Sequence, residues 1–170
     1  MSVSARCPVV FMTSQSAMVD HSMQITSAQF TSIVRVLGTD PFTIHDAARV
    51  IALARLAVES DEREDIDESD VLETLIGFVT TLAGRPGAPL DDVDDGRGDL
   101  PDRLARLTAA LEGRAAELAY VVSYLLTISD LNIDPEEEDF TDQLRVALSI
   151  SEDRAAELVA LINTAITPSE

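Results

Sequence analysis

The junction between two helical patterns in the C-terminal third of the chain reads Thr127-Ile-Ser-Asp-Leu-Asn-Ile-Asp-Pro-Glu-Glu-Glu-Asp-Phe140. We expect one helix to end near Asp130 and the next to begin with Asp134 as its N-cap, Pro135 at the first helical position and Glu137 at the third. This pattern is a capping box with proline in the position that it prefers. The junction contains no basic residue, so either a helix N-terminus or a cation must offset the charge of its carboxylates.

Two other junctions are also acidic. Together, 22 of the chain's 31 Asp and Glu residues lie in the windows 59–73, 91–102 and 130–142, each where one helical pattern ends and another begins. Capping explains Asp70, Asp134 and Glu137 without a ligand, because negative charge in the first turn of a helix stabilises it by about 0.3–1 kcal/mol per residue. It explains Asp61 and Asp130 less well, because each is expected at the end of a helix, where negative charge is unfavourable.

The apolar residues on either side of these junctions recur at steps of three and four, which predicts helices. The expected helices span residues of about 27–37, 44–60, 67–84, 101–128, 135–148 and 152–166. No alternating pattern bounded by hairpin turns predicts a strand. The chain is 46% hydrophobic but only 4% aromatic and has no Trp, so we expect a core of Leu, Ile, Val and Ala. The predicted fold class is all-α, a compact bundle of six to seven helices.

A chain of 170 residues is expected to form one domain. We assign residues 25–170 to a single all-helical domain with an acidic loop at about 85–100. Residues 1–24 hold all four Met residues among Ser, Thr and Gln, and we interpret them as a flexible N-terminal tail, with docking as an extended arm as the alternative. Their apolar patch at residues 8–12 is too short for a signal-peptide core.

The formal net charge of −19 argues against several classes of partner. A field of this sign repels nucleic acid and anionic lipid, and it attracts cations and basic proteins. All 12 basic residues are arginine, so the chain has no lysine for a phosphate-binding loop or a Schiff base. The single cysteine, Cys7, cannot form an internal disulfide and suits a reducing cytoplasm. No apolar run of 18 residues predicts a membrane span.

Calcium and magnesium prefer hard oxygen ligands, which the acidic turns supply. Five carboxylates are the candidate metal ligands: Asp130, Asp134, Glu137, Asp61 and Asp70. The last two would face the first three across the bundle. Neither acidic stretch matches an EF-hand loop, because proline falls where glycine is needed in the third window, and a valine falls at a ligand position in residues 91–102. Helix capping and a solvated loop are the alternatives to a metal site.

Residues 120–162 resemble the TerB-like family, which has the fold of tellurite-resistance protein B. In that family a helix ends in Asp-Gly, followed by an apolar residue, a capping Asp or Ser, often Pro, and a Glu that opens the next helix. The matching residues here are Asp130, Ile133, Asp134, Pro135 and Glu137, with Ser149-Ile-Ser151 as the turn before the last helix and Leu131 in place of the usual Gly. The resemblance implies an all-helical fold with two such helical pairs, the first around residues 60–70. It also implies acidic clusters that bind divalent metal, a role in stress response through partner proteins, and no catalysis.

Two functions compete on these grounds. The first is a non-enzymatic cytoplasmic TerB-like module that binds calcium or magnesium at the acidic inter-helix turns and acts in stress response, as in tellurite resistance, or as a scaffold. The alternative is a metal-independent adaptor whose acidic surface binds a basic protein partner and whose apolar helices form a homodimer. An enzyme that uses the carboxylate clusters is disfavoured, because no nucleophile or pocket-forming motif accompanies them. No nucleic-acid or membrane partner is expected.

Overall fold

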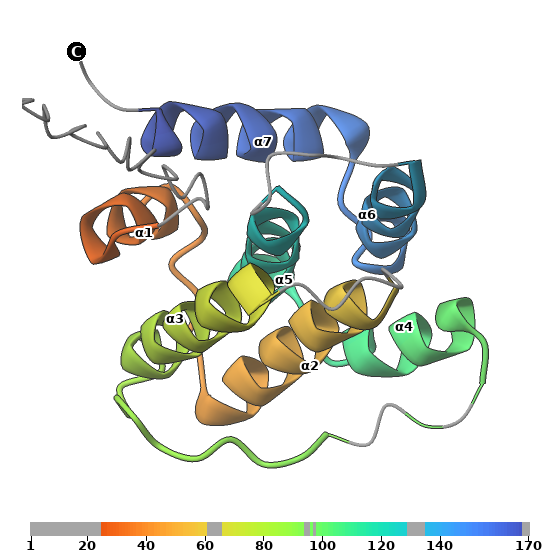
Figure 1. The fold of residues 1–170 in the computed structure, drawn as a ribbon, viewed down its shortest axis with the longest axis horizontal. Helices are drawn as coiled ribbons and strands as arrows, with labels where there is room; N and C mark the ends of the chain where they lie inside the picture. The colour runs from red at the N-terminus through yellow and green to blue at the C-terminus, as the bar shows by residue number, and fades with distance from the viewer. Residues whose placement is uncertain (1–24, 61–65, 94–95, 97, 129–134, 168–170) are drawn as a thin grey trace, which may run out of the picture.

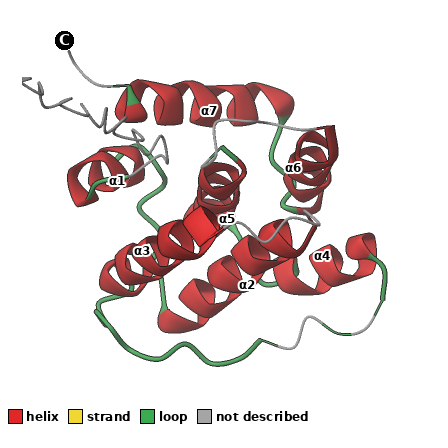
Figure 2. Ribbon diagram, viewed as in Figure 1, coloured by secondary structure: helices red, strands yellow, loops and turns green. Residues whose placement is uncertain are grey.

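The computed structural model describes residues 25–60, 66–93, 96, 98–128 and 135–167, with the backbone alone described at residues 60, 66–69 and 135–137. This part of the chain forms seven α-helices and no strand (Figure 1, Figure 2). The helices are α1 (Ser27–Val34), α2 (Ile44–Ser60), α3 (Ile66–Leu82), α4 (Leu100–Thr108), α5 (Gly113–Thr127), α6 (Pro135–Ala147) and α7 (Glu152–Ile166). The predicted all-α fold class is confirmed. None of these helices has the length and apolar character that crossing a membrane requires.

Helix α5 lies at the centre of the bundle, where it contacts α2, α3, α6 and α7 (Figure 1). It is buried on nearly all sides, as expected of a helix that others enclose. Its alanines Ala115, Ala116 and Ala119 are buried, and their small side chains let neighbouring helices approach closely. Around it, most of the buried side chains are Leu, Ile, Val and Ala, which agrees with the core expected from composition.

The predicted helix bounds are confirmed where local side chains cap the ends. Helices α2 and α7 span the predicted residues 44–60 and 152–166. At the start of α2, the Thr43 N–H and hydroxyl both donate to the Asp46 carboxylate at 2.8 Å, and the Asp46 N–H donates to the Thr43 hydroxyl oxygen at 3.2 Å. After α3, Gly84 adopts the left-handed conformation at φ +71°, which matches the expected end of that helix.

The prediction of one long helix over residues 101–128 is wrong. The chain instead forms α4 and α5, because Gly113 adopts a left-handed conformation at φ +51° that other residues rarely adopt. A Cβ at Gly113 would lie 2.5 Å from Asp40 Oδ2, so the Asp40 side chain would have to move to make room for it. The apolar period continues through the break because Leu111, within the turn itself, is buried.

All three acidic windows lie at helix junctions, as predicted: between α2 and α3, between α3 and α4, and between α5 and α6. The α3–α4 connection spans residues 83–99, close to the expected acidic loop at 85–100. Its last residue, Asp99, caps α4 by accepting a hydrogen bond from the Asp102 N–H at 3.1 Å. Leu90 and Val93 of this connection pack against the core, so apolar side chains fasten the acidic loop to the bundle.

Candidate functional site

The predicted metal ligands fall mostly outside the described residues. Asp61, Asp130 and Asp134 lie there, and Glu137 stands in the first turn of α6 with its backbone alone described. Asp70 lies on α3 and is exposed to solvent. Within the described ranges, no three His, Cys, Asp or Glu side chains form a group that could hold a metal ion. The divalent-cation site at the acidic turns therefore stays a prediction.

Arginine side chains lie beside the acidic α3–α4 loop. Arg55 Nη1 is 3.9 Å from Asp92 Oδ1, and the Arg106 guanidinium lies against Gly96, where any Cβ would collide with it. Val93, which falls at a ligand position of the EF-hand pattern, packs against the core instead. Positive charge at this loop thus comes from the protein's own arginines, which favours the solvated-loop alternative over a calcium loop.

A polar cleft of about 580 Å³ opens between α5, α6 and the start of α7. We call it the tyrosine cleft; its lining residues are Tyr120, Tyr124 and Thr127 of α5, Glu138, Thr141, Asp142 and Arg145 of α6, and Glu152 of α7. Within each of α5 and α6 these residues recur at steps of three and four, which places them on one face of the helix. Thr127 and Glu138 stand on either side of the acidic α5–α6 turn, so the cleft adjoins one of the three acidic junctions of the chain.

The wall that α5 contributes carries the only two tyrosines of the chain. The rings of Tyr120 and Tyr124 stack with centroids 6.3 Å apart and planes inclined by 16°. Tyr120 is buried, whereas Tyr124 is partly exposed to the cleft. Burial raises the pKa of both phenols above the ordinary value of 10.0. Both rings are therefore neutral near pH 7 and present an aromatic surface without a charge of their own.

The charge of the cleft is negative. Its exposed rim carries the carboxylates of Glu138, Asp142 and Glu152, against the single guanidinium of Arg145. That guanidinium is already engaged, because its Nε donates to Asp142 Oδ1 at 2.9 Å and its Nη1 donates to the Ile150 carbonyl at 3.2 Å. Its Nη2 also lies 3.8 Å from Glu152 Oε1, so the guanidinium partly offsets two of the three carboxylates and leaves the rim negative through Glu138. Carboxylates beside an aromatic surface are the arrangement that favours a cation, since a cation is attracted both by the negative charge and by the face of the ring.

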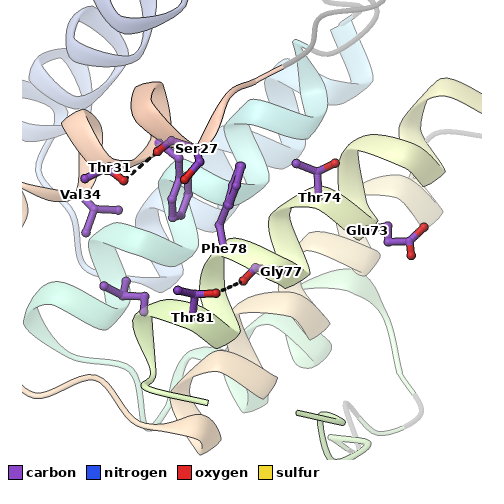
Figure 3. Close-up of a pocket in the computed structure, with 10 residues that line it drawn as sticks. Ser27, Thr31, Val34, Glu73, Thr74, Gly77, Phe78 and Thr81 are labelled. Atoms are coloured by element: carbon purple, nitrogen blue, oxygen red, sulfur yellow. Dashed lines mark hydrogen bonds between the residues drawn. The ribbon is translucent and has the colours of Figure 1, made fainter. Parts of the chain in front are cut away.

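A second hollow, of about 500 Å³, lies between α1 and α3 (Figure 3). We call it the apolar groove; its lining residues are Ser27, Phe30, Thr31 and Val34 of α1, and Glu73, Thr74, Gly77, Phe78, Thr81 and Leu82 of α3. The rings of Phe30 and Phe78 stack across it with centroids 4.9 Å apart. Glu73 is the only charged residue in this lining, so the groove differs from the tyrosine cleft in both charge and polarity.

Neither hollow was found by sequence reasoning. The spacing of Tyr120 and Tyr124, four residues apart and just ahead of an acidic window, was a signal for the tyrosine cleft. This spacing does not by itself distinguish a binding site from a core, because tyrosines at helical spacing are also ordinary core residues. The apolar groove gave no local signal, because its two walls come from helices that are separated by α2 along the chain.

No protein-family model, no curated protein and no solved structure matches the chain. The resemblance to the TerB-like family thus stays a prediction, and the geometry of the described residues carries the functional argument.

Proposed function

We propose that the protein is a non-enzymatic binding module that holds an arginine- or lysine-bearing segment of a basic protein partner in the tyrosine cleft. The observation that supports this proposal is that the partly exposed Tyr124 ring and the rim carboxylates of Glu138, Asp142 and Glu152 line the same cleft. This function corresponds to the adaptor alternative, in which the acidic surface recognises a basic partner without a metal ion.

The energetics favour a ligand of this kind. A cation over an aromatic face gains about 0.5–1 kcal/mol at an exposed site and about 2 kcal/mol where water is excluded. The net charge of −19 adds long-range attraction that raises the association rate of basic partners and weakens as salt rises. The aromatic contact provides the part of the affinity that is specific to the cleft. The net charge provides a part that is independent of where the partner binds.

A short fluorescent peptide with two arginines, titrated at low and at high salt and followed by anisotropy, tests the proposal. Tyr124→Leu keeps an apolar side chain and removes the ring, so we expect the Kd to rise by about two- to fivefold. Glu138→Gln should raise the Kd and reduce its salt dependence. Glu112→Gln is the matched control, because Glu112 is exposed at the start of α5, outside the cleft lining, and makes no side-chain capping bond.

If Glu138→Gln and Glu112→Gln weakened peptide binding equally and Tyr124→Leu had no effect, peptide binding would depend on the net charge of the protein alone. That result would reject the tyrosine cleft as the binding site.

A divalent cation at the acidic turns is the second candidate. Its ligands would be Asp130, Asp134 and Glu137, with Asp61 and Asp70 facing them, and most of these residues lie outside the described ranges. The stress-response role that the TerB-like resemblance implies belongs with this candidate. Calorimetry with each metal on the wild type and on Asp130→Asn tests it, and equally weak millimolar binding by both proteins would reject it.

A further inference from the structure

The floor of the apolar groove is an exposed glycine in the middle of α3. A Cβ at Gly77 would have no atom of another residue within 4 Å, and Figure 3 shows Gly77 between Thr74 and Thr81 on the wall that α3 forms. Glycine inside a helix costs about 0.5–1 kcal/mol relative to alanine, and no positive φ requires it here. The residue therefore leaves open space on this wall of the groove, at a cost in the stability of the helix.

The three threonine hydroxyls of the groove already donate hydrogen bonds within their own helices. The Thr31 hydroxyl donates to the Ser27 carbonyl and the Thr81 hydroxyl donates to the Gly77 carbonyl, both at 2.7 Å (Figure 3). The Thr74 hydroxyl donates to the backbone of its own helix in the same way, at 3.0 Å. An occupant consequently gains little from the threonines and gains most from apolar surface packed against Phe78 and Leu82, which are partly exposed, whereas Phe30 is buried behind Phe78.

The chain carries such an occupant immediately before α1. Residues 8–12 read Pro-Val-Val-Phe-Met, a run of five apolar residues, and the whole of residues 1–24 contains one arginine and one aspartate in a protein that is 25% charged. The groove has the same low charge. Low charge and apolar character thus match this segment, rather than the acidic remainder of the chain, to the groove.

The length of the connection allows the contact. Twelve residues separate Met12 from Ile25, which is buried just before Ser27 at the edge of the groove. Twelve extended residues reach about 40 Å, whereas the 17 residues of α3 measure about 25 Å along the helix axis. A tether of this length gives the segment an effective concentration in the millimolar range, well above that of a second copy at ordinary protein concentrations.

We propose that residues 8–12 of the same chain dock in the apolar groove between α1 and α3, so that the N-terminal segment is an intrachain arm. The apolar side chains of the segment cover Phe78 and the open surface at Gly77. This proposal takes the extended-arm alternative for residues 1–24 in place of the flexible tail, and it stands apart from the function proposed for the tyrosine cleft.

Cys7 provides the test, because the single cysteine of the chain lies next to the docking segment and accepts a nitroxide spin label without any engineered site. In the full-length, isotope-labelled protein, we expect the label to broaden the amide signals of Thr74, Gly77 and Thr81. The signal of Val146, exposed on α6, should stay sharp. Phe11→Asp should abolish the broadening, whereas Ser16→Asp, which places the same charge in the connection, should not.

Two results would overturn the proposal. One is the absence of selective broadening at the three groove residues. The other is broadening that persists when the two labels are on different molecules, in a mixture of spin-labelled protein without isotopes and isotope-labelled protein without the spin label, because the occupant would then be the segment of a second copy. Gly77→Leu provides an independent check: a side chain in the open space should displace the segment and restore sharp signals at Thr74 and Thr81 while the protein stays folded.

Discussion

The tyrosine cleft and the apolar groove are both hollows between helices, but their walls differ in chemistry and in their place in the fold. The cleft is bounded by α5, the central helix, and carries three rim carboxylates, whereas the groove is bounded by the outer helix α1 and by α3 and carries one. The net charge of −19 is therefore unevenly distributed over the surface of this protein. A cationic ligand suits the first hollow, and an apolar segment suits the second.

The largest expected effect separates the two rings of the tyrosine cleft. Tyr120→Ala should lower the free energy of unfolding by about 3 kcal/mol, because Tyr120 is only 4% exposed and its loss leaves a cavity beside the central helix. Tyr124→Ala should cost about 1 kcal/mol, because Tyr124 is partly exposed. Urea unfolding followed by circular dichroism measures both. Equal losses would mean that the two tyrosines do not divide into a structural ring and a ligand-facing ring.

A smaller effect is expected at the ion pair that fixes α7, and with it Glu152, beside the cleft. Arg154 donates to Glu117 of α5 through Nε at 2.7 Å and Nη2 at 3.1 Å. Glu117→Ala should lower the unfolding free energy by about 1 kcal/mol, since the pair is bidentate but partly exposed. Glu157→Ala removes a more exposed partner of the same arginine, so its loss should be smaller. A reversal of this order would contradict the assignment of Glu117 as the anchor.

In the apolar groove, the expected change in stability has the opposite sign. Gly77→Ala should raise the unfolding free energy by about 0.5–1 kcal/mol, because alanine is the better helix former and its Cβ meets open space among the described residues. Gly113→Ala is the contrasting control and should be destabilising, because Gly113 has φ +51° and lies against Asp40. Thermal unfolding measures both changes. A loss of stability in Gly77→Ala would show that the new methyl group meets an occupant of the groove or that the helix needs glycine for another reason.

The smallest effect concerns pH and belongs to the cleft alone. Burial raises the pKa of Tyr120 and Tyr124 in the folded state above 10.0, so folding favours the neutral phenols. The stability that they contribute is fully present below pH 10 and is lost as the pH rises through the raised folded-state pKa values. The midpoint of thermal unfolding should therefore fall more steeply above pH 10 in the wild type than in Tyr120→Phe. Identical slopes would contradict the burial of this phenol.

The parts of the fold that local chemistry determines could be predicted from the sequence. Thr43 with Asp46 and Ser151 at the start of α7 lie within one turn of the helix ends that they cap, so a short stretch of sequence was sufficient. The α4–α5 corner was missed, because Leu111 preserves the apolar period while Gly113 turns the backbone. The spacing of apolar residues indicates which side chains are buried, not where the backbone turns. Because the corner between α4 and α5 faces the core, its side chains stay buried and the apolar spacing does not change there.

The candidate sites were less predictable, because each depends on how helices pack. Tyr124 and Glu138 come into one cleft only when α6 lies beside α5, and Phe30 meets Phe78 only when α1 lies across α3. The acidic windows were identified correctly as helix junctions, since capping preferences act locally. Three of the metal ligands predicted there lie outside the described residues: Asp61, Asp130 and Asp134. A metal site at these junctions therefore stays a prediction.

The enclosure of α5 has a consequence for how ligands of the two hollows would be detected. Backbone amides of a central, enclosed helix are expected to exchange with deuterium only when the whole protein opens. A ligand that binds at Tyr124 contacts this helix, which opens only when the whole protein unfolds. Its binding free energy should therefore appear as slower amide exchange throughout the molecule and as a higher melting temperature. An occupant of α1, an eight-residue peripheral helix, should slow exchange only nearby, so a deuterium map would distinguish the two.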